Sequence, residues 1–290
     1  MKKNFYNLLL SLFILIFCLS ASLAAEAKSR SPRGAAYRRS FYRSLSKRLS
    51  RNRADYPHLT DEEFANFRVV TTTGMGRGTL YRSSSPVNPW GNRNHIADNA
   101  AQNAGIKTFV NLADTEEKLQ RYKSFKSSYY RTQDIISLNL NWKYQSDVFQ
   151  ERLSEGIRLM AHSQPPFLIH CDLGKDRSGF VCAVLEALMG ASAQEIVADY
   201  LVSFYNYFGI RPNTRDYNFV AHNEILSSLT IAFGIRDIFN DNLAAAAERY
   251  LLRIGVPDRD LASLCSTLEM ELKPLEESDY GNLPQMNHGF

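Results

Sequence analysis

The sequence is poor in cysteine, and the spacing of its cysteines excludes a fold held together by disulfides. Four cysteines occur among 290 residues, namely Cys18, Cys171, Cys182 and Cys265. If the first is lost with an N-terminal leader, an odd and widely spaced set of three remains, which is no disulfide framework. A free thiol that persists in an exported protein needs a chemical reason, and nucleophilic catalysis would provide one.

Long apolar runs are missing after the first 27 residues, so no later segment is predicted to span a bilayer. The N-terminus has the pattern of an export signal. Lys2 and Lys3 precede an apolar stretch at 8–19, and the Ala-Glu-Ala segment at 25–27 matches a cleavage site. An uncleaved anchor is the alternative. We therefore expect residues 1–27 to be a signal peptide and the protein to be exported, either to the periplasm or as a secreted protein.

Acidic residues are absent from Lys28 to Arg53, where ten lysines or arginines occur. From residue 54 onward the chain has 22 basic and 29 acidic residues, so the net charge of +4 hides a basic arm on a mildly acidic domain. Apolar side chains recur in this arm every four residues: Tyr37, Phe41, Leu45 and Leu49.

This spacing makes residues 28–56 a flexible basic arm that can form an amphipathic helix. Two interpretations stay open for it. One is a solvated linker or pro-segment, and the other is attachment of residues 28–53 to an anionic membrane or an acidic partner. Binding to nucleic acid is not expected of an exported protein.

Beyond residue 57 the hydrophobic pattern predicts strands that alternate with helices. Strands are predicted at 67–70, 80–83, 107–112, 135–140 and 167–170. Helices are predicted at 95–104, 147–161, 178–189 and 193–208, and after residue 213 at 217–233, 241–253 and 258–273. The predicted fold of residues 57–290 is therefore α/β, a mostly parallel central sheet flanked by helices, with an all-helical C-terminal extension.

The strongest chemical signal lies between the strand at 167–170 and the helix that follows it. Five residues separate Cys171 from Arg177, which is about the length of backbone that curls around a phosphate with its N–H groups inward. The following helix directs its N-terminus at the same point. The guanidinium group of Arg177 can bind two phosphate oxygens. These surroundings favour the thiolate of Cys171, which is placed for in-line attack on phosphorus.

The neighbouring residues extend this signal. His170 is expected to order the loop rather than transfer protons, and Ser178 is placed to hydrogen-bond the thiolate as leaving group. Gly174 and Gly179 allow the backbone conformation and close approach that the loop needs. The predicted phosphate-binding set is Asp172, Leu173, Gly174, Lys175, Asp176 and Arg177.

The segment 170–179, His-Cys-Asp-Leu-Gly-Lys-Asp-Arg-Ser-Gly, resembles the signature loop of the protein tyrosine and dual-specificity phosphatase superfamily. Its Gly-Lys-Asp-Arg core is similar to that of atypical bacterial tyrosine phosphatases, several of which also act on phosphoinositides. The segments at 80–86, 105–112 and 199–201 agree in order and spacing, and the likeness covers roughly residues 64–255. The resemblance implies the tyrosine-phosphatase-like sandwich fold.

The same resemblance implies three roles: Cys171 as nucleophile, Arg177 as phosphate binder and transition-state clamp, and Ser178 as helper of the leaving thiolate. The general acid that protonates the leaving oxygen is less certain. Many relatives carry it some thirty residues before the cysteine, where this sequence has Asn139 and Asn141. In the Gly-Lys-Asp-Arg group the loop aspartate takes this role, here Asp176. The alternatives are Asp147, Asp134 and Asp114.

The resemblance thus implies a phosphomonoester hydrolase with a phosphocysteine intermediate, foremost a protein-tyrosine phosphatase that needs no metal or other cofactor. Its partners would be phosphorylated proteins. A phosphoinositide or dual-specificity phosphatase is the alternative, and an inactive phosphate-binding module is a remote one. Lys175 would help to bind substrates with several phosphates, or would simply face solvent. Cys182 and Cys265 are predicted to be core thiols, and Arg82 is predicted to tie one loop to another.

Overall fold

The computed structural model describes residues 32–272, and the chain divides into two compact units, residues 1–49 and residues 50–290. The predicted signal peptide lies outside the described residues. In the first unit, α2 (Pro32–Arg48) forms the helix that the four-residue spacing of the arm favours. The rings of Tyr37 and Phe41 stack with centroids 6.4 Å apart, as expected for neighbours on one helical face.

The second unit is built on a five-stranded sheet with the order β1-β2-β5-β3-β4. The strands are β1 (Arg68–Val69), β2 (Leu80–Ser83), β3 (Thr108–Asn111), β4 (Asp134–Ser137) and β5 (Phe167–His170). Only β1 and β2 are antiparallel, so the predicted mostly parallel sheet is confirmed. The neighbouring inner strands β3 and β5 are buried along their whole length, in agreement with their apolar and β-branched residues.

The strand register brings the predicted catalytic loop to one edge of the sheet. His170, the last residue of β5, is aligned with Ser83 of β2 and with Asn111 of β3, and Asn111 is aligned with Ser137 of β4. Because these four strands are parallel, the segments that follow them all leave the sheet at the same edge. This edge is where open α/β sheets commonly bind ligands.

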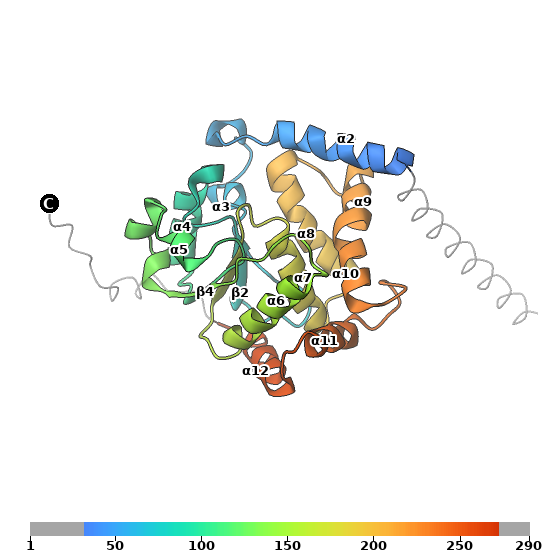
Figure 1. Cartoon of the computed structure of the whole chain (residues 1–290). Helices are drawn as coiled ribbons and strands as arrows, with labels where there is room; N and C mark the ends of the chain where they lie inside the picture. Colours follow the sequence, from blue (N-terminus) through green and yellow to red (C-terminus); the bar gives the residue numbers. More distant parts are fainter. Residues whose placement is uncertain (1–31, 273–290) are drawn as a thin grey trace, which may run out of the picture. The chain divides into compact units, whose positions relative to one another are not determined.

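Helices surround this sheet (Figure 1). The helix α3 (Asp61–Phe64) precedes β1. The helices between the strands or after the last strand are α4 (Asn94–Asn103), α5 (Glu116–Leu119), α6 (Asp147–Met160), α7 (Arg177–Leu188) and α8 (Ala193–Phe208). The helix α7 is buried from Arg177 to Ala187 and packs against α8, α10 and α11. Its apolar character on every side follows from this central position. Ser146 caps α6, since its side chain accepts a hydrogen bond from the amide of Phe149.

The predicted all-helical C-terminal part is present. It consists of α9 (Arg215–Ala221), a π-helical turn η5 (His222–Leu226), α10 (Ser227–Phe233), α11 (Leu243–Arg253) and α12 (Asp258–Leu268). The last helix ends five residues before the predicted end at 273. Met270 and Leu272 instead bond to the segment before β2, through Thr79 Oγ1 and the carbonyl of Arg77. Among residues 32–272, no helix is long and apolar enough to cross a bilayer.

Short helices before and between the strands had no clear periodic signal. They include α3, α5 and the 3₁₀ turns η1 (Arg53–Asp55), η2 (Pro89–Gly91), η3 (Ser124–Ser127) and η4 (Tyr130–Thr132). Residues 50–56, assigned from the sequence to the arm, belong to the second unit, where Tyr56 packs with Leu59 and Phe64 in a small core cluster.

Candidate active site

Cys171 is the first residue after β5, at the edge of the sheet where the parallel strands end. Its side chain is buried, and it is one of three free cysteines in the part of the chain that the structure describes. The loop that follows runs to Arg177, which is the first residue of α7. The strand, loop and helix predicted for the signature segment are therefore present.

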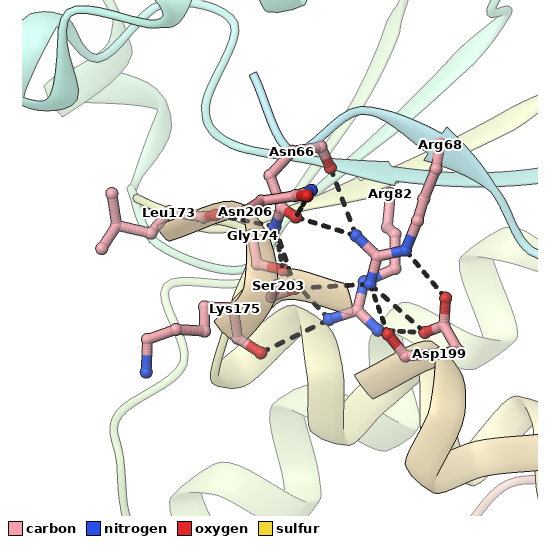
Figure 2. A network of polar contacts seen from close by, with 9 residues as sticks. All are labelled: Asn66, Arg68, Arg82, Leu173, Gly174, Lys175, Asp199, Ser203 and Asn206. Carbon is pink, nitrogen blue, oxygen red and sulfur yellow. Dashed lines mark hydrogen bonds and ion pairs between the residues drawn. The ribbon is translucent and has the colours of Figure 1, made fainter. Parts of the chain in front are cut away.

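The carbonyl groups of residues 172–176 all accept hydrogen bonds, most of them from outside the loop. Figure 2 shows those that Asn66 and Arg82 donate to residues 173–175. The carbonyl of Asp172 accepts from the amide of Ser85 at 3.2 Å, and that of Asp176 accepts from the amide of Phe180 at 2.9 Å. Three side chains bind the carbonyls between them: Asn66, Arg82 and Tyr207. The amides of residues 173–176 donate to no other atom of the described chain, which leaves them available to an anion.

Gly174 is required by the turn of the loop. Its φ is +65°, a left-handed conformation that glycine adopts without strain. A β-carbon at this position would also collide with the backbone carbonyl of Ser83 at the end of β2. Both the backbone conformation and this close approach therefore require a glycine in the loop.

Arg177 is held at the mouth of the loop by three oxygens. Its Nη1 donates to the carbonyls of Leu112 and Leu140 at 3.2 and 3.1 Å, and its Nη2 pairs with Asp172 Oδ2 at 2.5 Å. The Nε atom is buried and has no partner among the described residues. The carboxylate of Asp172 is itself oriented by Asn88 Nδ2 at 2.9 Å. The arginine predicted to bind phosphate is thus fixed beside the free amides.

Trp142 is a site residue that the sequence reasoning did not find. Its ring covers the guanidinium group of Arg177, with the centroid 4.4 Å from Cζ, and more than half of its surface, 57%, is exposed. It belongs to the segment after β4, where only a general acid was expected from the sequence. An isolated tryptophan in a polar loop was the available signal, because such a residue is costly to expose without a partner.

His170 and Ser178 flank the loop on the buried side. His170 Nε2 lies 3.1 Å from the hydroxyl of Tyr130, and burial lowers the pKa of this histidine to about 4. It is therefore neutral near pH 7, in agreement with an ordering rather than proton-transferring role. The Oγ atom of Ser178 is buried without a partner in the described chain, which leaves it free to donate to a thiolate.

Lys175 and Asp176 pair with each other at the outer end of the loop. The ammonium group of Lys175 contacts the Asp176 carboxylate and also lies 4.4 Å from the centre of the Phe204 ring. The Lys175 side chain is only 12% exposed, so the solvent-facing interpretation does not describe it, and its binding to phosphate stays a prediction. Asp176 occupies the N-cap position of α7 and makes no capping hydrogen bond, so its carboxyl group is not used by the helix.

The other candidate acids lie in different surroundings. Asp134 begins β4 and is level with Phe167 across the sheet, three residues from the edge that bears the loop. Asp147 is exposed in the first turn of α6. Asp114 is fully buried, and its Oδ1 pairs with Lys118 Nζ at 2.5 Å. Asp176 is the candidate that the chain places next to Arg177.

The remaining cysteines differ in burial. Cys182 is fully buried on α7, as predicted, and burial raises its pKa to about 12. Cys265 is only partly buried on α12, so its prediction as a core thiol was wrong. It lies on the flank of a terminal helix, where an apolar position is not fully covered.

Comparison with known proteins agrees with this geometry. A tyrosine phosphatase family model matches residues 62–254, and the chain belongs to this family. A tyrosine-protein phosphatase of Nostoc commune is 23% identical over 203 residues, which cover 55% of this chain and 65% of that protein, just under two thirds of its length. The family predicted from the signature loop is confirmed.

Two solved structures show weaker likeness. TpbA of P. aeruginosa in complex with pTyr is 18% identical, covering 59% of this chain and 91% of that chain, with a TM-score of 0.36. The core catalytic domain of the PP-IP phosphatase SIW14 from S. cerevisiae is 19% identical, covering 55% and 85%, with a TM-score of 0.34.

The burial of His170 predicts how stability depends on pH. The pKa falls from 6.5 in the unfolded chain to about 4 in the folded chain, so between these values only the unfolded chain binds the proton. The free energy of unfolding should therefore fall as the pH is lowered from 6.5 to 4, by about 3 kcal/mol from this residue.

Urea unfolding at several pH values measures this loss. His170→Gln keeps a polar atom near Tyr130 but does not titrate, so its stability should fall less steeply with acid than that of the wild type. The exposed His58, changed to Gln, is the matched control and should leave the slope unchanged. Equal slopes for the wild type and His170→Gln would contradict the assignment.

Proposed function

We propose that this protein is a cysteine-dependent phosphomonoester hydrolase whose substrates are proteins phosphorylated on tyrosine. One observation carries the proposal. A buried free cysteine and a fixed arginine enclose a loop whose carbonyls are all bonded and whose amides at 173–176 are free within the described chain. A ring of amides with a helix N-terminus binds a dianion such as a phosphate monoester.

In the proposed reaction, the Cys171 thiolate attacks phosphorus as the phosphate lies in this ring of amides. The ester P–O bond breaks, a P–S bond forms, and Asp176 donates a proton to the departing oxygen. Water then attacks the phosphocysteine, with Asp176 as base. The P–S bond breaks, Ser178 donates a hydrogen bond to the returning thiolate, and inorganic phosphate leaves. Arg177 binds the equatorial oxygens in both steps.

Aromatic surfaces beside the loop support phosphotyrosine over the dual-specificity and phosphoinositide alternatives. Trp142 lies over Arg177, and a cavity of about 350 Å³ lined by Asn88, Trp90 and Asp172 opens beside the Asp172–Arg177 pair. Trp90 is 44% exposed at this cavity. Flat exposed rings next to a phosphate site favour an aromatic leaving group. Lys175, which a multiply phosphorylated lipid would need, is paired with Asp176.

Hydrolysis of para-nitrophenyl phosphate in the presence of a chelator tests the nucleophile. Cys171→Ser should lower kcat on the order of a thousandfold, because a serine hydroxyl is not ionised near pH 7. Cys265→Ser is the control and should retain wild-type activity. Phosphotyrosyl peptides should be better substrates than phosphoseryl peptides or phosphoinositides. Equal turnover by wild type and Cys171→Ser, or none by either, would refute the proposal.

The general acid can be identified from the leaving group. Asp176→Asn should lower kcat by roughly a hundredfold or more for phenyl phosphate, because phenoxide needs a proton to depart. The loss should be smaller for para-nitrophenyl phosphate, whose leaving group is a weaker base. Asp147→Asn is the matched control and should keep both rates. A loss confined to the Asp147 variant would assign the role to that residue instead.

We also propose that residues 1–27 direct export and that the arm binds anionic lipid surfaces. Arg39, Arg43 and Lys47 are exposed at four-residue spacing on α2, so they form a cationic row on one side of the helix. Full-length mature protein should sediment with vesicles that contain phosphatidylserine and not with neutral vesicles. Replacing the three cations with Gln should abolish this. Equal sedimentation of the variant, or an unprocessed N-terminus in the exported fraction, would contradict these proposals.

A further inference from the structure

Behind the loop, on the side to which its carbonyls point, two arginines share one carboxylate (Figure 2). Arg68 Nε lies 2.8 Å from Asp199 Oδ1, and Arg82 Nη1 bonds to Asp199 Oδ2. Arg82 is fully buried. Burial opposes ionisation of Asp199, but the charges of Arg68 and Arg82 outweigh it, and the pKa of the carboxyl group falls to about 2. This ion-pair cluster is therefore charged near pH 7.

Arg82 connects the cluster to the loop. While Nη1 binds Asp199, Nη2 donates to the carbonyl of Gly174 at 3.0 Å and approaches that of Lys175 at 3.4 Å. Asp199 lies on α8 and Arg82 on β2, so the direction of the guanidinium group is set by two elements outside the loop. Arg82 was predicted to tie one loop to another, and it instead ties the loop to the helix α8.

Asn66 makes the second connection. Its Nδ2 donates to the carbonyls of Leu173 and Gly174, both at 3.1 Å, while its Oδ1 accepts from Arg68 Nη1 at 2.9 Å. The residue is fully buried and has a φ of +54°, which asparagine tolerates better than most residues. One amide group therefore bridges the arginine cluster and two carbonyls of the loop.

These contacts determine where the amides of the loop point. A trans peptide group is planar, and its N–H is directed opposite to its C=O. Fixing the carbonyls of Leu173, Gly174 and Lys175 toward Asn66 and Arg82 therefore directs the next three amides to the opposite side. The loop between Cys171 and Arg177 therefore presents these amides away from Asn66 and Arg82.

The cluster also leaves positive charge behind the loop, since two guanidinium groups face one carboxylate. Glu186 and Cys182 are the other titratable groups close to it. Burial raises the pKa of Glu186 well above its usual value and that of Cys182 to about 12, which disfavours a negative charge on either group. The excess of guanidinium groups over carboxylates in the cluster favours an anion in the loop.

We propose that Asn66 and the Arg82–Asp199 pair are positioning residues, which hold the loop amides toward the anion and so set both the affinity for phosphate and the reactivity of Cys171. The inference rests on the proposed function, because it assigns these residues to the same anion site. None of them is required to touch the substrate.

Asn66→Gly is the sharpest test, because glycine accepts the positive φ and removes only the bridging amide. The Kd for inorganic phosphate should rise roughly tenfold or more, the loss expected when a buried hydrogen-bond bridge worth about 1.4 kcal/mol is removed. Alkylation of Cys171 by iodoacetamide at pH 6 should slow by a similar factor. The control is Asn213→Gly, an exposed residue with a φ of +61°, and it should change neither quantity.

Arg82→Lys is the second variant, since it keeps the charge but cannot bind Asp199 and the Gly174 carbonyl together. It should weaken phosphate binding while circular dichroism shows a folded protein. A folded Asn66→Gly or Arg82→Lys protein with wild-type phosphate affinity and alkylation rate would overturn the inference. If Asn66→Gly weakens phosphate binding but the wild type hydrolyses no phosphate monoester, only the proposed function is refuted.

Discussion

The carbonyl groups of residues 172–176 cannot turn toward the cysteine, because each accepts a hydrogen bond elsewhere. This constraint shapes the candidate site. It directs the amides of the loop away from Asn66 and Arg82, and it does so before any substrate arrives. Preorganised donors of this kind stabilise charge without a reorganisation cost at the moment of reaction. The loop sequence provides the groups, and the surrounding fold sets their direction.

Holding the carbonyls in this way requires charged groups in a buried position, which costs free energy unless these groups are paired. Arg82 and Asp199 are almost fully buried, and buried charges are tolerated only when they are paired and hydrogen-bonded. Arg68 and Asn66 complete these contacts from the segment around β1, and Ser203 adds a hydroxyl from α8. The short edge strand β1 and the residues just before it therefore contribute Arg68 and Asn66 to the contacts between α8 and the loop.

Much of the fold followed from hydrophobic pattern. A compact β-rich run predicted β3, a short apolar run predicted β5, and the hydrophobic pattern predicted α6 and α8 within one residue. The end of α12 could not be predicted, because the residues after it are held by hydrogen bonds to the distant segment before β2. Short helices such as α3 and α5 depend on a single cap and have too few turns to show a period.

For the site, local sequence was informative wherever the chemistry is local. Cys171, Arg177, Ser178 and the glycine turn lie within one segment. Their spacing and neighbours predicted a phosphate loop, and the resemblance of segment 170–179 to a known signature loop implied the family to which the chain belongs. Trp142 on Arg177 and Asn66 on the loop carbonyls were decided by tertiary structure alone. These partners lie 35 or more residues from the groups they contact, and the sequence around them does not indicate which groups those are. The sequence therefore determined which atoms can react, and the packing of β1, β2 and α8 decided how the loop holds them.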